Sequence, residues 1–154
     1  MSTSMAAQDA RSAAGALAGS AAWTRYLVPL GRAAFAGVFV VFAPGDFTRE
    51  GATLAAQQGV PLSGALVPLA GVISVAGGLS VVLGYRARAG AWLLILFLVP
   101  VTFWMHNFWA VRDPMMAQMQ FGFFMANVSR VGGALLIAHF GAGPLSLDAR
   151  AHRR

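Results

Sequence analysis

The sequence predicts an all-α integral membrane protein, an antiparallel up-and-down four-helix bundle with a short interfacial helix between the first two spans. Of its 154 residues, 58% are apolar and only 10% are charged, whereas soluble domains average about 25% charged residues. The apolar residues also lie in long blocks, unlike the alternating pattern of transmembrane barrel strands. Helices are therefore the expected way for this chain to cross a bilayer.

Four apolar segments each approach the roughly 20 residues that a helix needs to cross about 30 Å of hydrocarbon. They cover residues 26–43, 63–84, 89–109 and 118–140. Between the first two, Thr48 is a suitable N-cap for a short helix to Gln57, which Gly59 and Pro61 would end. The other connections are short, so consecutive helices should pack antiparallel. We expect a membrane domain at 23–148, a disordered cytoplasmic tail at 1–22 and a basic cytoplasmic tail at 149–154.

The arginines outside the spans predict the orientation. The side of the two termini holds Arg11, Arg25, Arg86, Arg88, Arg150, Arg153 and Arg154, and the other side holds Arg49 and Arg112. The positive-inside rule then places both termini in the cytoplasm. Membrane lipids are the expected surroundings. Nucleic acid is not an expected partner, because no basic run with interleaved exposed aromatics is present.

Two arginines lie within the predicted spans. Arg130 is near the middle of the fourth span, where a charge costs about 3 kcal/mol on insertion scales. No acidic residue lies inside any predicted span, so its expected partner is a carbonyl, a polar side chain, water, a lipid phosphate or a ligand. Arg32 is two turns into the first span. Its side chain can reach headgroups or serve a structural role.

Polar side chains are expected to gather on the non-cytoplasmic side. Gln120, Asn127 and Arg130 share one face of the fourth helix, because they are seven and three residues apart. His106 and Asn107 end the third span at the depth where the fourth begins. We interpret the five as candidates for a shared ligand pocket, with groups that hydrogen-bond quinone carbonyls. In the alternative interpretation these side chains satisfy one another at a helix interface.

No residue is assigned a catalytic or metal-binding role. The chain has no cysteine, nucleotide-binding loop, metal-ligand cluster or nucleophile triad. Haem is not expected from a single chain, because His106 and His139 end oppositely directed spans and should lie roughly 30 Å apart. The chain is therefore not expected to be a complete enzyme by itself.

Over residues 26–150 the sequence resembles the DoxX family of small bacterial membrane proteins. Its characteristic stretches are Leu30-Gly31-Arg32, Gly59-Val60-Pro61, Gly84-Tyr85-Arg86, His106-Asn107-Phe108-Trp109 and Gly143-Pro144-Leu145-Ser146-Leu147-Asp148. The resemblance implies a multi-pass protein of the bacterial cytoplasmic (inner) membrane. It also implies a subunit of a quinone-linked or oxidative-stress-related oxidoreductase complex, with quinone as ligand and a redox protein as partner.

Two other functions stay open at this point. The Arg-bearing tails and small-residue helix faces also suit a non-catalytic membrane scaffold that recruits a partner protein. Arg130 in mid-membrane suits a small-solute conduit, which would require a homo-oligomer because four helices enclose little space.

Overall fold

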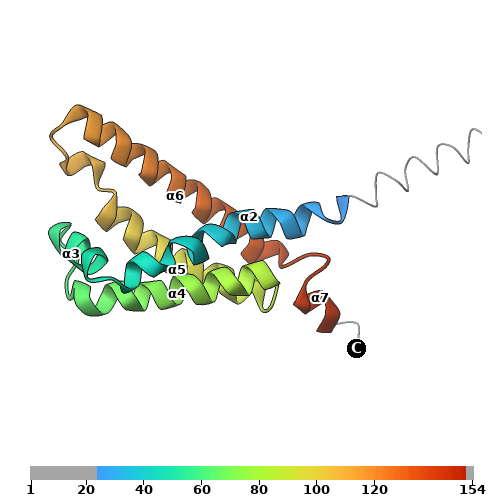
Figure 1. The fold of residues 1–154 in the computed structure, drawn as a ribbon. Coiled ribbons are helices and arrows are strands. Elements are labelled where there is room, and N and C mark those ends of the chain that lie inside the picture. Colours follow the sequence, from blue (N-terminus) through green and yellow to red (C-terminus); the bar gives the residue numbers. More distant parts are fainter. Residues whose placement is uncertain (1–23, 152–154) are drawn as a thin grey trace, which may run out of the picture.

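The computed structural model describes residues 24–151, and all the regular secondary structure within them is helical (Figure 1). In chain order the elements are α2 (Leu27–Phe42), the 3-10 helix η1 (Ala43–Phe47), α3 (Arg49–Gln57), α4 (Ser63–Leu83), α5 (Ala87–Met105), the 3-10 helix η2 (Phe108–Ala110), α6 (Pro114–Phe140) and α7 (Leu147–Ala151). Four of the described helical segments are long and apolar enough to cross a membrane. The predicted four-helix membrane bundle with a short helix between the first two spans is confirmed.

The helix ends differ from the expected ones where local capping decides them. The fourth span begins at Pro114, four residues before the predicted start, because the Asp113 side chain accepts a hydrogen bond from the Met116 amide at 2.8 Å. The third helix ends at Met105, because the backbone leaves the helical conformation at His106, and η2 continues the third membrane-spanning segment to Ala110.

The predicted tails lie largely outside the residues that the structure describes. The predicted tail at 1–22 lies outside the described residues. The predicted boundary at 148 falls inside α7, which runs from Leu147 to Ala151. The last three residues also lie outside the described part of the chain.

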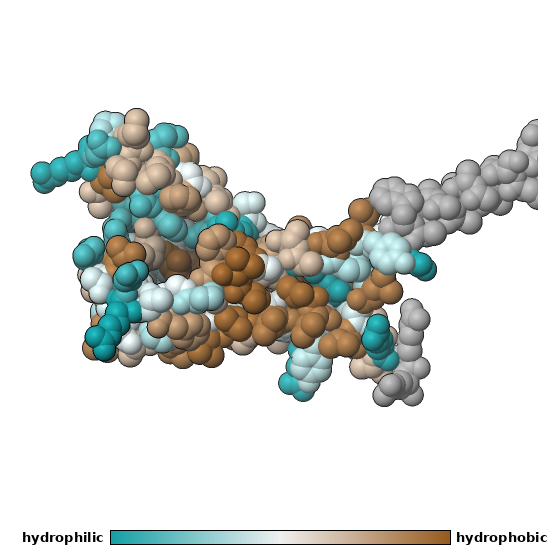
Figure 2. Space-filling view, viewed as in Figure 1, coloured by the Kyte–Doolittle hydropathy of each residue, from teal (hydrophilic) through white to brown (hydrophobic). Residues whose placement is uncertain are grey.

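The core lies where α2, α4 and α5 meet. Phe39, Val81, Leu94 and Leu98 are buried together there. Small residues allow the close approach that helices in lipid favour, since a Cβ added to Gly78 would come within 3.2 Å of the Ala36 carbonyl. Many large apolar side chains instead face outward. Figure 2 shows them as a broad hydrophobic surface, which indicates contact with lipid.

Helix α6 makes the bundle asymmetric. Only 11% of its span is buried inside the protein, against 22–28% of the other three spans. It approaches α2 near Gly133, where an added Cβ would lie 2.9 Å from the Phe35 ring. From there toward its N-terminus it diverges from α2 (Figure 1). We call the end with α3 and η2 the open end, and the end with the α4–α5 turn and α7 the closed end.

Candidate functional site

The divergence of α6 leaves a cavity of about 230 Å³ at the open end, which we call the cleft. Its walls are mainly apolar side chains of α2 and α5, such as Phe39 and Phe97. Five polar residues also line it: Asp46, Ser74, His106, Asn127 and Arg130. Figure 2 shows this region as a hollow with hydrophilic residues along its α6 side.

Arg130 and Asn127 form a pair on α6. The Arg130 guanidinium donates a 2.5 Å hydrogen bond to Oδ1 of Asn127, which the three-residue spacing along a helix allows. Asn127 is only 6% exposed, whereas Arg130 is half-buried and lines the cleft. The amide thus holds the guanidinium at the cavity wall and leaves several of its five donors available.

His106 is positioned from the other side of the cleft. It is the C-cap of α5, and its Nδ1 lies 2.9 Å from Oε1 of Gln120 on α6. Because that oxygen can only accept, Nδ1 is the donor, and Nε2 is the atom left for a ligand. Gln120 therefore orients His106 and does not itself line the cleft.

Asn107 is separate from this group. The Asn107 side chain does not line the cleft. Its backbone carbonyl accepts a hydrogen bond from the Ala110 amide in the short turn of η2. The structure thus brings His106, Asn127 and Arg130 together around one cavity, with Gln120 behind His106.

Asp46 is a polar cleft residue that the sequence did not predict, and Ser74 is another. The first span was expected to end at Ala43, but η1 continues the helical path to Phe47. The Asp46 side chain packs on α4 at Gly71, because a Cβ added to Gly71 would lie 2.8 Å from the Cβ of Asp46. The expectation that no acid lies inside a span is therefore wrong, because Asp46 lies within the first membrane-spanning segment and in the same cavity as Arg130.

Ser74 lines the cleft and joins two of the helices that form it. Its hydroxyl donates a 3.2 Å hydrogen bond to the Phe39 carbonyl and so joins α4 to α2. Four residues beyond Phe39, α2 gives way to η1. This bond therefore holds α2 against α4 just before the turn that places Asp46.

Arg32 belongs to the closed end. It is 4% exposed, and its guanidinium donates to the Ala142 carbonyl at 2.6 Å and the Leu145 carbonyl at 3.2 Å. The Arg32 side chain does not extend to the surface, where it would meet headgroups. Its geometry is that of a structural residue, because it joins the start of α2 to the loop after α6.

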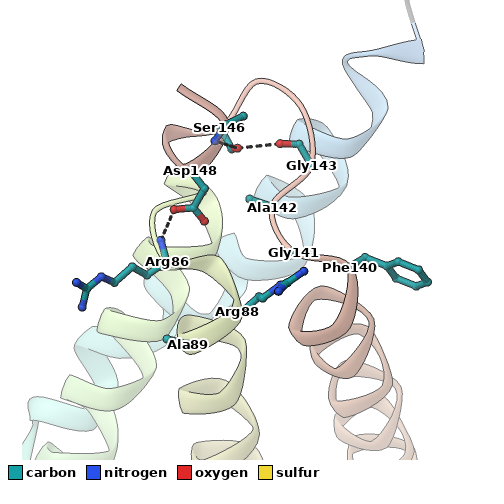
Figure 3. Close-up of a pocket in the computed structure, with 10 residues that line it drawn as sticks. Arg86, Arg88, Ala89, Phe140, Gly141, Ala142, Gly143, Ser146 and Asp148 are labelled. Carbon is teal, nitrogen blue, oxygen red and sulfur yellow. Dashed lines mark hydrogen bonds between the residues drawn. The ribbon is translucent and has the colours of Figure 1, made fainter. Parts of the chain in front are cut away.

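Asp148 completes the closed end (Figure 3). Its carboxylate accepts hydrogen bonds from the amides of Arg86 at 2.8 Å and Ala87 at 3.1 Å, and its own amide donates to the Gly84 carbonyl at 2.8 Å. The residue after α6 that caps α5 is thus 62 positions away from Arg86 in sequence. Two of the short stretches noted in the sequence, around Gly84 and around Asp148, contact each other here.

Comparisons with known proteins identify the family. The model of the SURF4 family matches residues 64–153, more than half of the chain. Among curated proteins, the ER-derived vesicles protein ERV29 of Saccharomyces cerevisiae is 29% identical over 77 residues, which cover 50% of this chain and 24% of the relative. The match thus spans about a quarter of that relative's length. No solved structure matches.

These findings correct the interpretation drawn from the short sequence stretches. The resemblance to the DoxX family is wrong, and with it the quinone-linked or oxidative-stress-related oxidoreductase subunit. The multi-pass membrane location is confirmed by the four candidate spans. The bacterial cytoplasmic membrane was implied by the DoxX resemblance and loses that support.

Proposed function

Because this chain belongs to the SURF4 family, we propose that it is a membrane receptor that binds a short polar segment of a partner protein in the cleft. The observation behind the proposal is that Asp46 and Arg130, residues of opposite charge, line one cavity in the half of the bundle where the helices diverge. Charged side chains at membrane depth are costly and typically serve a binding role.

The mixture of charges indicates what would bind. Arg130 can donate to a carboxylate or carbonyl, Asp46 can accept from an amine or amide, and Nε2 of His106 can do either according to its protonation. A purely anionic ligand would be repelled by Asp46. A peptide segment, whose groups both donate and accept, suits the pair better, and Phe39 and Phe97 offer apolar surface for its side chains.

The volume limits how much of the partner enters. At about 30 Å³ for each water molecule, a cavity of about 230 Å³ has room for roughly eight waters, or one to two side chains. A chain terminus or a single side chain would enter, and the rest of the partner would lie outside the bundle. The yeast relative is named for its presence in ER-derived vesicles, and a receptor role in moving a bound partner between membranes agrees with that name.

The orientation belongs to the same proposal. Arg25, Arg86, Arg88 and Arg150 lie at the closed end, and Arg49 and Arg112 lie toward the open end. The positive-inside rule therefore places the closed end in the cytoplasm and opens the cleft on the opposite side. Because the chain contains no cysteine, single-cysteine variants E50C and R150C labelled with a membrane-impermeant maleimide test this directly. Labelling of R150C alone in sealed right-side-out membranes would contradict it.

Site-specific photo-crosslinking in native membranes tests the binding. A photoreactive amino acid at Phe42, in the cleft wall, should yield a discrete protein adduct, and the same probe at the outward-facing Leu30 should yield only lipid adducts. The adduct should be lost in Arg130→Gln and in Asp46→Asn. Matched charge changes outside the cleft, Arg112→Gln and Glu50→Gln, should leave it intact.

Two results would overturn the proposal. Adducts from Phe42 that contain lipid alone would show that the cleft holds a lipid and not a protein segment. A protein adduct that survives both Arg130→Gln and Asp46→Asn would show that the polar groups of the cleft do not recognise the partner.

A further inference from the structure

A second and larger cavity, of about 490 Å³, lies at the closed end. It is bounded by the N-terminal turn of α5 and by the segment from the end of α6 to α7 (Figure 3). It shares no lining residue with the cleft. We propose that this cavity binds a phosphate group, with Arg88 as its principal ligand.

Arg88 points into the cavity. Figure 3 shows its guanidinium directed toward Gly141, and a Cβ added to Gly141 would lie 3.3 Å from Nε and 3.8 Å from Nη2 of Arg88. Gly141 has a φ of 82°, a conformation that glycine adopts readily. The residue that ends α6 thus leaves the guanidinium room along the cavity wall. Within residues 24–151 the structure shows no hydrogen bond from this guanidinium.

Asp148, the acidic residue that lines the cavity, caps the start of α5. Both carboxylate oxygens of Asp148 accept hydrogen bonds from the amides of Arg86 and Ala87. This places the negative charge at the start of α5, where the helix dipole stabilises it. Two arginines and one aspartate line the cavity. Arg86 itself extends away from the cavity toward Tyr85.

The position of the cavity agrees with a phosphate. The α5 helix begins here and α6 ends here, so the cavity lies at the edge of the spans, at the depth of lipid headgroups. Basic pockets between transmembrane helices at this depth bind anionic headgroups, and the planar guanidinium of arginine matches two phosphate oxygens at once. Phe140, 73% exposed at the rim, offers apolar surface beside the charged group.

The phosphate can come from an anionic lipid or from solution, and one titration separates these sources. The purified full chain in a neutral detergent is titrated with short-chain phosphatidic acid, with short-chain diacylglycerol and with inorganic phosphate, and its thermal unfolding is followed. A rise in unfolding temperature with phosphatidic acid alone identifies a lipid headgroup. An equal rise with inorganic phosphate identifies free phosphate.

Variants assign the effect to this cavity. Arg88→Gln should weaken binding of the effective probe by about tenfold or more, the effect of losing a charge-assisted hydrogen bond. Arg88→Lys, which keeps the charge and loses the planar fork, should fall in between. Arg112→Gln, at the open end, should bind as the unaltered protein does.

The unliganded unfolding temperature of each variant reports whether it is folded, independently of binding. If neither phosphatidic acid nor inorganic phosphate raises the unfolding temperature, the proposal is wrong. It is also wrong if a folded Arg88→Gln variant binds the probe with the affinity of the unaltered protein. A shift of the same size with short-chain diacylglycerol, which has no phosphate, also overturns it, because apolar chains would then account for the binding. None of these results bears on the cleft.

Discussion

Arg32 and Arg130 are both arginines inside membrane spans, yet the structure uses them in opposite ways. Arg32 is 4% exposed and donates to two carbonyls from a segment more than a hundred residues away in sequence. Arg130 is half-buried, and its hydrogen bond goes to Asn127 on its own helix. A distant partner makes the first arginine a link between helices. A local partner leaves the second available at the wall of an open cavity.

The same contrast extends to the two ends of the bundle. At the closed end, Asp148 caps α5 although it lies 62 residues from Arg86 in the sequence. At the open end, Thr48 and Asp113 each cap the helix that follows directly. Local caps stabilise single helices but do not join them. The open end is therefore the part of the bundle expected to open at lowest free-energy cost, which suits a binding site.

The largest expected effect compares the two arginines. Arg32→Leu removes two charge-assisted hydrogen bonds and leaves the Ala142 and Leu145 carbonyls unpaired, so unfolding in mild detergent should become easier by about 3 kcal/mol or more. Arg130→Leu loses one local bond and also a costly buried charge, so its free energy of unfolding should change by less than about 1 kcal/mol. Equal losses in the two variants would contradict the comparison.

Two glycines with a positive φ extend the comparison between the closed end and the open end. Gly84 (φ 66°) lies against Arg32 and Ser146, whereas Gly59 (φ 80°) has open space where a Cβ would lie. Gly84→Ala should therefore destabilise the protein by about 2–3 kcal/mol, from backbone strain plus overpacking. Gly59→Ala should cost about 1 kcal/mol from strain alone. Thermal unfolding measures both, and similar losses would show that the closed end relaxes around the new methyl group.

The two aspartate caps should differ less. Asp148→Ala removes two hydrogen bonds that join α7 to α5, and should lower the free energy of unfolding by about 2 kcal/mol. Asp113→Ala removes one bond within α6 and should lower it by about 1 kcal/mol. Hydrogen exchange at the start of α5 should rise in the first variant only. Exchange that rises equally at both ends would mean that the two ends unfold as one unit.

The smallest effect is expected for the hydrogen-bonded pair of His106 and Gln120, which joins the end of α5 to α6. A double-mutant cycle on His106→Ala and Gln120→Ala should give a coupling free energy below about 1 kcal/mol, because the pair is a single half-buried hydrogen bond. A coupling above about 2 kcal/mol would show that the open end is held as firmly as the closed end.

Part of the candidate site could be predicted from the sequence. The spacing of Asn127 and Arg130 predicts that they share a helix face, and the structure joins them by a hydrogen bond. The depth of His106 predicts that it meets the start of the fourth helix, where Gln120 bonds it. Asp46 was missed, because Pro44 and Gly45 suggest the end of a helix. The earlier start of α6 was readable, since Asp113 followed by Pro114 is a typical helix start.

The sequence by itself determined that this protein is a four-helix membrane bundle. Long apolar blocks leave a chain in lipid no other way to satisfy its backbone hydrogen bonds, and this holds whatever the blocks pack against. The tertiary structure alone decided which arginine is buried, which acid enters the cleft and where α6 separates from α2. Each depends on contacts between residues far apart in the chain, such as Arg32 with Ala142 and Asp46 with Gly71, and no local pattern specifies such contacts.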